Sequence, residues 1–339
     1  MELFNFFKKN NKQEFTSCEW IEYGVHFSPR GLDHCCMYVP ASKDMGPASP
    51  LKKGQYNFND FYKKKKKLKK DQRKGIISDK CKGCYVLQKK VWKKKKEFEN
   101  VVLNLNYKCN ADCIYCFTHK AKLYFNTRVK DVPVYKIMEK AIKKKLILPN
   151  CEIHLGGGEP LLNNEFEDLV KLFLDNDCNN LKIYTSGIIY SKGIEKAISK
   201  TACKVYISTD SANRELYKKI KNVDKHDEVW NNIKNYCNAQ TKDGVCVWPK
   251  YIIIPEVNDT EEFISEFIDK VIESGAKAIV TDIERGWYDT NSKDEEKMKP
   301  IIKLLKFLIT KAKDNNLEVL NFPASVYAID TYNDFYNSI

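Results

Sequence analysis

Long apolar runs are missing from this sequence. None approaches the roughly 18 consecutive apolar residues that a membrane-spanning helix requires. The first residues, MELFNFFKKN, place apolar side chains before lysines and show no small-residue cleavage site, so they do not resemble a secretory signal. We therefore expect a cytoplasmic protein without a membrane span. In that reducing compartment, the 13 cysteines are expected to be metal ligands or reduced core residues rather than disulfides.

Arginine is also scarce, because only five of the 58 basic residues are Arg. Residues 51–100 hold nineteen Lys or Arg and five Asp or Glu, whereas the rest of the chain is close to neutral. The excess includes KKKKKLKK (63–70) and KKVWKKKK (89–96). Phosphate recognition often favours the bidentate guanidinium of Arg. We therefore interpret the segment as a solvated, partly disordered insert; the alternative is a patch that binds nucleic acid, acidic lipid or an acidic protein.

Beyond residue 98 the sequence alternates between strand-like and helix-like periods. Strands are expected at 98–106, 151–157, 181–187, 204–210, 245–259 and 276–284. Helices are expected between them and at 295–316, the last interrupted by Pro300. Repeated βα units imply a parallel sheet. We predict an α/β protein with a partial (β/α)6 TIM-type barrel at 98–290, a small cysteine- and lysine-rich module at 1–97, and a C-terminal helix and closing segment at 291–339.

Motifs that suggest chemistry follow the predicted strands. YKCNADCIYCF (107–117) places Cys109, Cys113 and Cys116 at spacing C-x3-C-x2-C, with no fourth cysteine beside them. A structural zinc ion or a fully protein-ligated cubane cluster takes four ligands, so three thiolates leave one metal position open. HLGGGEP (154–160), TSG (185–187) and STDS (208–211) follow the next three strands. On a barrel, these loops would meet at one mouth.

Together these motifs resemble those of the radical S-adenosylmethionine (SAM) enzymes, over roughly residues 99–290. The resemblance implies a [4Fe–4S] cluster on Cys109, Cys113 and Cys116, with SAM on the fourth iron. It also implies SAM contacts from Tyr115 near adenine, from Gly157, Gly158 and Glu159 at the amino group, from Ser208 and Asp210 near the ribose and methionine, and from Ser186. Many relatives carry an Arg soon after the strand-four Asp. This sequence has Lys219 and Lys221 there, which leaves the partner of the SAM carboxylate open.

The resemblance further implies a reaction. A reduced cluster delivers one electron to SAM, and the resulting 5′-deoxyadenosyl radical abstracts hydrogen from a substrate. That substrate is either a peptide or protein side chain or a small metabolite, and the electron donor is a protein such as flavodoxin or ferredoxin. Nucleic acid is not expected as a partner. The competing hypothesis is a zinc-stabilised nucleic-acid-binding protein that uses the lysine-rich segment.

A second set of cysteines precedes the predicted barrel. GVHFSPRGLDHCCM (24–37) predicts a hairpin around a Pro-Arg-Gly turn, and KCKGC (80–84) supplies a C-x2-C pair. The set resembles the SPASM/twitch auxiliary-cluster module of some radical SAM enzymes, although there the module usually follows the barrel. The resemblance implies a second [4Fe–4S] cluster, or a zinc ion, on four thiolates. These are Cys18, Cys36, Cys81 and Cys84, with Cys35 as the spare or alternate ligand.

Two further places invite alternative interpretations. His154, just before the glycine-rich motif, is either a core histidine or part of the barrel lining. In the loop after the sixth strand, Asp282, Glu284 and Arg285 either contact substrate or form a surface loop held by salt bridges.

Overall fold

The computed structural model describes residues 14–35, 49–82, 84, 86–116 and 133–322. Six parallel strands form the centre of its large sheet, and their order in the sheet follows their order in the chain. They are β6 (Phe98–Asn106), β7 (Ile147–Gly157), β8 (Leu181–Thr185), β9 (Cys203–Ser208), β10 (Val247–Ile253) and β11 (Ala278–Ile283). All six predicted strands are therefore present.

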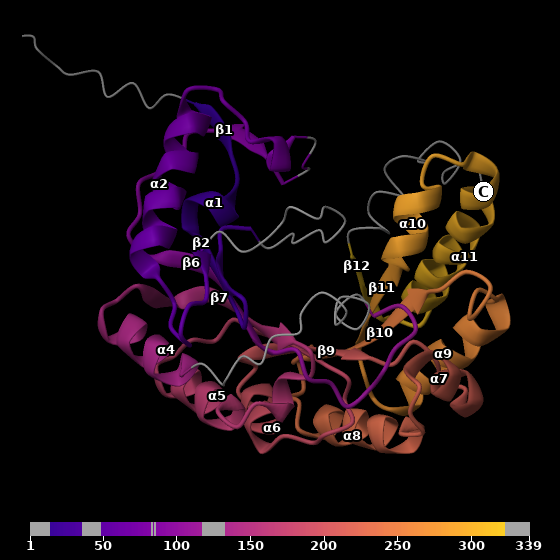
Figure 1. Cartoon of the computed structure of the whole chain (residues 1–339). Helices are drawn as coiled ribbons and strands as arrows, with labels where there is room; N and C mark the ends of the chain where they lie inside the picture. Colours follow the sequence, from indigo (N-terminus) through magenta and orange to yellow (C-terminus); the bar gives the residue numbers. More distant parts are fainter. Residues whose placement is uncertain (1–13, 36–48, 83, 85, 117–132, 323–339) are drawn as a thin grey trace, which may run out of the picture.

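Helices connect these strands. They are α4 (Val134–Lys143), α5 (Phe166–Asp175), α6 (Lys192–Ser199), α7 (Arg214–Lys221), α8 (His226–Asn238) and α9 (Glu261–Glu273). Figure 1 shows that the sheet is curved and that α4, α5, α6 and α8 lie along its outer side. The alternation of parallel strands and covering helices confirms the predicted α/β partial barrel.

Alternate residues of each strand face opposite sides of the sheet. Ile153, Leu155 and Ile183 are fully buried and belong to one large core with helix residues such as Leu169 and Phe173. The opposite, concave side carries a smaller cluster formed by Tyr206, Trp248, Ala278 and Val280. The main core thus lies between the sheet and its helices, and a second set of side chains lines the interior of the barrel.

Strands from the N-terminal segment extend the sheet beyond β6. Strand β2 (Gly24–Ser28) pairs in parallel with β6, with His26 opposite Val102. It forms the predicted hairpin with β3 (Gly31–Asp33), which pairs with β4 (Ser49–Pro50). A separate pair consists of β1 (Phe15–Ser17) and β5 (Gln88–Lys90). The N-terminal segment and the predicted barrel therefore share one sheet.

The chain after β11 closes the other edge. Strand β12 (Glu318–Asn321) pairs in parallel with β11, after helices α10 (Arg285–Asn291) and α11 (Glu295–Asp314). The predicted interruption at Pro300 is wrong, because α11 runs through it. A proline in a helix loses one backbone hydrogen bond. Burial of Met298 and Ile302 stabilises this part of the helix. The division into 1–97, 98–290 and 291–339 stays a prediction.

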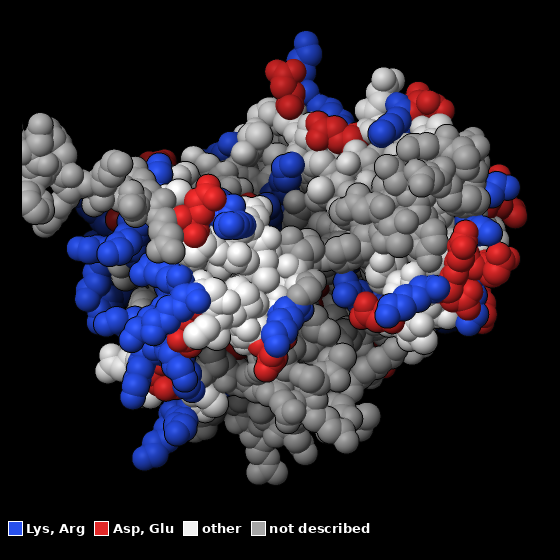
Figure 2. All heavy atoms as spheres, turned by 90° about the horizontal axis from the view of Figure 1, so that it is seen from above, with Lys and Arg blue, Asp and Glu red and all other residues white. Residues whose placement is uncertain are grey.

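The lysine-rich segment contains a long helix, α2 (Phe58–Arg73), so its interpretation as a partly disordered insert is wrong over these residues. Phe61 and Lys65 of this helix are buried. The Lys65 ammonium donates to the carbonyl of Gly24, which caps the C-terminal end of the short helix α1 (Glu19–Tyr23). Most other lysines of this helix are exposed. Figure 2 shows Lys and Arg side chains gathered on the side of the molecule where α2 lies in Figure 1.

In the described part of the chain, no helix has both the length and the apolar composition needed to cross a membrane.

Candidate functional site

The three cysteines lie on one loop directly after β6, which we call the three-cysteine loop (residues 109–116). Cys109 is exposed, and Cys113 and Cys116 are partly buried. Although part of Cys109 is exposed, the atoms packed around its thiol partly desolvate it and raise its pKa, and the charges of Glu159, Cys113 and Cys116 raise it further. Burial also raises the pKa of Cys113, although the nearby Lys221 ammonium acts in the opposite direction. The three thiols are thus close enough to influence one another's charge.

The C-terminal end of α7 holds this loop. The backbone N–H of Asp112 donates to the carbonyl of Lys221 over 2.9 Å, and that of Ile114 donates to Ile220 over 3.0 Å. The last carbonyls of a helix have no partner within the helix. Here the three-cysteine loop supplies two of the missing donors, so the loop and the helix end stabilise each other.

The glycine-rich motif packs against the start of the same loop. Gly158 N–H donates to Asn106 C=O over 2.8 Å, and Glu159 N–H donates to Lys108 C=O over 2.7 Å. A Cβ on Gly158 would collide with the Lys108 carbonyl, and one on Gly157, whose φ is +115°, would lie 2.5 Å from the Asn106 carbonyl. These two glycines are therefore required by the close approach of the chain's own backbone.

The Glu159 side chain is completely buried and joins the ends of two strands. Its carboxylate accepts hydrogen bonds from the hydroxyl of Thr185 (2.9 and 3.1 Å), and from the backbone N–H and the hydroxyl of Ser186 (both 2.7 Å). It also accepts from Leu161 N–H over 3.2 Å. Neutral and backbone donors thus solvate this carboxylate inside the protein, and TSG after β8 is tied to GGGEP after β7.

Asp210, just after β9, and Lys221 are buried, and both contact the partly buried Tyr115. Its carboxylate accepts from the Tyr115 hydroxyl and pairs with the Lys221 ammonium, which lies 2.9 Å from that hydroxyl. Asp210 also accepts from Ile252 N–H over 2.9 Å. Burial lowers the pKa of Lys221, but the Asp210 carboxylate together with the nearby Cys113 and Cys109 outweighs it, and the net shift is upward. Lys221 therefore remains an ammonium at neutral pH.

Two buried amide atoms beside the three-cysteine loop have no hydrogen-bond partner within the described residues. They are Oδ1 of Asn106 and Nδ2 of Asn110. Buried polar atoms are almost always bonded. An acceptor and a donor are therefore left for a bound group, next to three thiols that suit iron. The donor set fits a [4Fe–4S] cluster with SAM. Asn110, whose side-chain oxygen lies 3.0 Å from the Ser186 hydroxyl oxygen, was missed by the sequence analysis because a lone Asn carries no motif.

The residues assigned to SAM by resemblance therefore gather at one end of the sheet. Gly158 and Glu159 bond to the residues just before the three-cysteine loop, and Ser186 bonds to Glu159. Asp210 bonds to Tyr115 inside the loop. Ser208 ends β9 and is in register with Lys250. Their contacts with SAM stay predictions. Of the two lysines, Lys221 is buried and Lys219 is exposed.

His154 lines the interior of the barrel and is hydrogen-bonded on both ring nitrogens. One nitrogen lies 2.6 Å from a Glu152 oxygen and the other 3.2 Å from the Tyr184 hydroxyl. The rings of His154 and Tyr184 are nearly parallel, and Tyr184 stacks in turn on Tyr206. Burial raises the pKa of Glu152, but hydrogen bonds from His154 and Lys182 outweigh it and lower the pKa to about 2. A connected polar and aromatic wall results.

The loop after β11 has a structural role at two of its three candidate positions. The Glu284 carboxylate accepts from Trp287 N–H and caps α10. Arg285 pairs with Asp289 one helical turn later, over 2.7 Å. Asp282 belongs to β11 and is in register with Ile252. It is the one of the three that remains a candidate for substrate contact.

Thiols of the N-terminal segment also gather. Burial raises the pKa of Cys18 to about 11, and the nearby Cys35 and Cys81 contribute to this shift. Cys81 is influenced in the same way by burial and then by Cys35 and Cys84. Cys36, the predicted ligand, lies outside the described residues. Neither here nor at the three-cysteine loop does the described chain hold three His, Cys, Asp or Glu side chains already arranged around a single metal ion.

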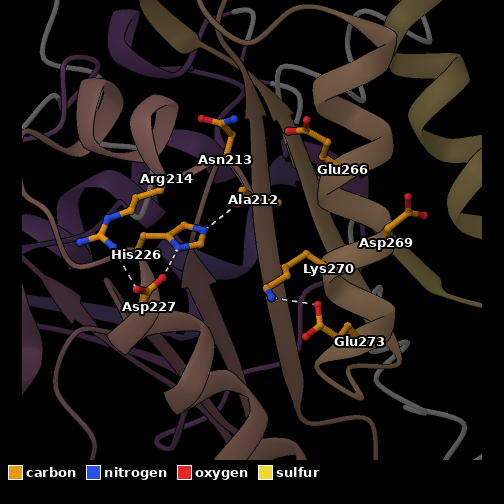
Figure 3. Close-up of a pocket in the computed structure, with 9 residues that line it drawn as sticks. All are labelled: Ala212, Asn213, Arg214, His226, Asp227, Glu266, Asp269, Lys270 and Glu273. Carbon is orange, nitrogen blue, oxygen red and sulfur yellow. Dashed lines mark hydrogen bonds and ion pairs between the residues drawn. The ribbon is translucent and has the colours of Figure 1, made fainter.

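A hollow of about 550 Å³ lies away from these thiols, between α7, α8 and α9 (Figure 3). Arg214 pairs with Asp227 over 3.2 Å, and Lys270 pairs with Glu273 over 2.8 Å. His226 is bonded through both ring nitrogens, to Asp227 and to the carbonyl of Ala212. These four charges pair with one another, and the carboxylates of Glu266 and Asp269 also line the hollow.

Known proteins are similar to the part of the chain that carries this site. Residues 103–268 match the family model of the Radical SAM superfamily. A probable GTP 3′,8-cyclase of Methanococcus aeolicus is 25% identical over 128 residues, which cover 37% of this chain and 42% of that protein. The GTP 3′,8-cyclase of Aliarcobacter butzleri is 26% identical over 192 residues, covering 53% of this chain and 59% of that protein. The chain thus matches less than two thirds of the length of either relative.

Solved structures share the fold. Streptococcus suis SuiB bound to S-adenosylmethionine superposes with a TM-score of 0.54 at 15% identity, over 82% of this chain and 59% of that chain. SuiB bound to its precursor peptide SuiA gives a TM-score of 0.53 at 13% identity, over 90% of this chain and 61% of that chain. At such identities the likeness concerns the fold alone.

The match of residues 103–268 confirms, for this part of the chain, the family expected from the motifs, and it supports a [4Fe–4S] cluster and SAM as cofactors. Together with the similar GTP 3′,8-cyclases it confirms the expectation of an enzyme. The likeness of residues 1–97 to a SPASM/twitch module and the second metal site stay predictions. None of the matches described above points to a zinc-stabilised nucleic-acid-binding protein. The matched residues 103–268, slightly less than half of the chain, contain the three-cysteine loop, GGGEP and STDS, so the radical SAM assignment holds for this part of the chain.

Proposed function

We propose that this chain reductively cleaves SAM at a [4Fe–4S] cluster on Cys109, Cys113 and Cys116, and abstracts hydrogen from a substrate in the barrel. The observation that supports this most directly is the anchoring of three thiols on one loop at the end of β6, beside two unpartnered amide atoms. When bound, the cluster and SAM supply a single electron and a C–S bond whose cleavage gives methionine and a 5′-deoxyadenosyl radical. The protein contributes binding, orientation and exclusion of water.

The described contacts suggest how SAM is oriented. The Glu159 carboxylate is already used by Thr185 and Ser186, so we assign recognition of the SAM amino group to the backbone of 157–159. The Tyr115 hydroxyl is engaged by Asp210 and Lys221, which leaves its ring as the part that meets adenine. Asn106 Oδ1 and Asn110 Nδ2 would find their missing partners in the bound group.

Substrate is proposed to contact the wall of the barrel interior formed by His154, Tyr184, Tyr206 and Trp248. Aromatic side chains exclude water, which protects a reactive radical from side reactions. The relatives suggest two substrate classes: a peptide, as in the complex of SuiB with SuiA, and the nucleotide named in GTP 3′,8-cyclase. An electron donor such as flavodoxin or ferredoxin would reduce the cluster.

The N-terminal thiols are proposed to hold a second [4Fe–4S] cluster or a zinc ion. Cys18, Cys81 and Cys84 supply three ligands, and the mutual influence of Cys35 with Cys18 and Cys81 supports Cys35 as the fourth. Cys36 remains the alternative ligand. A redox-active cluster here could accept the electron that remains on substrate after hydrogen abstraction, whereas zinc would be structural.

Cleavage of SAM tests the main proposal. The anaerobically reconstituted and reduced protein should convert SAM to 5′-deoxyadenosine, which chromatography with mass detection quantifies. Cys113→Ala should abolish this conversion because it removes one of three cluster ligands. Cys237→Ala, on α8 outside both thiol groups, is the matched control and should behave like the wild type. Wild-type production of 5′-deoxyadenosine by Cys113→Ala would refute the assignment.

A further inference from the structure

Lys221 is a buried cation beside the proposed cluster site, and none of the roles assigned so far requires it. Only 1% of this residue is exposed. Its ammonium pairs with the Asp210 carboxylate, donates to the Tyr115 hydroxyl over 2.9 Å, and lies 5.2 Å from the centre of the Tyr115 ring. An ammonium in such a position needs strong partners, because a buried charge is costly when it is unpaired.

These contacts link the three-cysteine loop to a rigid part of the barrel. Tyr115 stands inside the loop, between Cys113 and Cys116. Asp210 is fixed at the end of β9, since its carboxylate accepts from Ile252 N–H over 2.9 Å and its carbonyl accepts from the Asn258 side chain over 3.0 Å. Lys221 connects the two, because its ammonium reaches both side chains.

The main chain of Lys221 reinforces the link. Its carbonyl accepts from Asp112 N–H over 2.9 Å, so the same residue holds the loop at two points. Tyr115 also packs against an apolar cluster that contains Ile220 and Ile252, which adds an apolar contact to the link. Lys219, two positions earlier on α7, is exposed and shares none of these contacts.

We propose that Lys221 is a positioning residue that locks the three-cysteine loop against the end of β9 in the apoprotein, before any cluster or SAM is bound. This role rests on the proposed function in one respect, which is that the cysteines of the loop are taken as the ligands of the cluster. Two of the three N–H donors of Lys221 serve Asp210 and Tyr115. One N–H of Lys221 is left for the SAM carboxylate, the role that the sequence left open for this residue.

Hydrogen–deuterium exchange of the full-length apoprotein, under reducing and anaerobic conditions, tests the lock. The amides of Asp112 and Ile114 report on it directly, because their acceptors are carbonyls of α7. Lys221→Met should accelerate exchange in peptides that cover residues 109–116 by about tenfold or more, through local opening. Peptides from α5 and β8 should exchange as in the wild type. Lys219→Met removes the same charge from the same helix and should leave the loop unchanged.

Loss of Lys221 also leaves the Asp210 charge unpaired, which could loosen the whole barrel. If α5 and β8 also exchange faster in Lys221→Met, the double variant with Asp210→Asn removes that charge and becomes the test. Faster exchange confined to the loop in the double variant supports the proposal. The proposal is overturned if the loop exchanges at the wild-type rate in either the single or the double variant while α5 stays protected from exchange.

Tyr115→Phe separates the lock from the ion pair. It keeps the Lys221–Asp210 pair and the packing of the ring but removes the hydroxyl that joins them, so the loop should open more than in the wild type and less than in Lys221→Met. If the loop exchanges at the wild-type rate in this variant, the hydrogen bonds of the Tyr115 hydroxyl do not stabilise the loop. Because these measurements use no cluster and no SAM, they stand or fall independently of the 5′-deoxyadenosine assay.

Discussion

The glycines of GGGEP offer a steric test of how the site is built. Three variants add one methyl group at each of three consecutive positions: Gly156→Ala, Gly157→Ala and Gly158→Ala. At Gly156 the new Cβ would meet the Tyr184 side chain at 3.6 Å, an ordinary contact. At Gly158 it would overlap the backbone carbonyl of Lys108, which cannot rotate away. Gly156→Ala is therefore a matched control for Gly158→Ala.

The cost at Gly158 follows from two contributions. Overpacking a filled site costs about 1–3 kcal/mol. Separation of the two segments would also weaken the hydrogen bonds from Gly158 to Asn106 and from Glu159 to Lys108, each contributing about 0.5–1.5 kcal/mol. We expect a loss of about 2–6 kcal/mol in the free energy of unfolding, or an equivalent displacement of the loop. Gly157→Ala should also be harmful, because its φ of +115° is strained for Ala.

Two measurements distinguish displacement from unfolding. Urea denaturation of the apoproteins gives the change in the free energy of unfolding, and iron content after reconstitution reports on the geometry of the cysteines. Gly158→Ala should lose stability or iron, whereas Gly156→Ala should keep both within experimental error. Normal stability together with full iron loading and SAM cleavage in Gly158→Ala would refute the described approach of the two backbones.

Two further predictions concern the N-terminal segment. Burial lowers the pKa of Lys65 to about 7, while an unfolded Lys keeps a pKa of about 10.4. The unfolded chain then binds more protons between these values, so the free energy of unfolding should rise by on the order of 2 kcal/mol from pH 7 to 9. Urea denaturation should show this rise in the wild type and in the exposed-site variant Lys66→Met, but not in Lys65→Met; an equal rise in all three would contradict it. For the second metal site, changing the three loop cysteines to Ala should leave about four irons per chain, and adding Cys81→Ala and Cys84→Ala should remove them. If metal analysis finds zinc, the site is structural. If it finds no metal in the variant that lacks the three loop cysteines, the N-terminal thiols bind no metal.

The elements of the barrel were predictable because local periodicity reports on burial. FENVVLNLN became β6 with Val101, Leu103 and Leu105 on the core side, as its alternation requires. The family could be identified for a related reason. The spacing of the three cysteines and the order of the motifs along successive strands are properties of the chain itself, and parallel strands bring their C-terminal ends to one edge.

Contacts between residues that are far apart in the sequence were not predictable. The lysine run looked solvated because its charge dominates its composition, and only the nearby end of α1 provides a carbonyl for Lys65. The resemblance gave Gly157 and Gly158 only a role in SAM binding, whereas the structure places the backbone of 106–108 where their Cβ atoms would lie.

Lys221 shows most clearly where sequence information ends. Its neighbours Tyr115 and Asp210 are 106 and 11 residues away in the chain, and no local period relates the three. From the sequence, Lys219 and Lys221 were equivalent candidates for the same role. The chain alone determined that strands, helices and three thiols would meet at one mouth. Only the tertiary structure decided which lysine turns inward, because a buried ammonium is stable only where a carboxylate and a hydroxyl from distant segments converge on it.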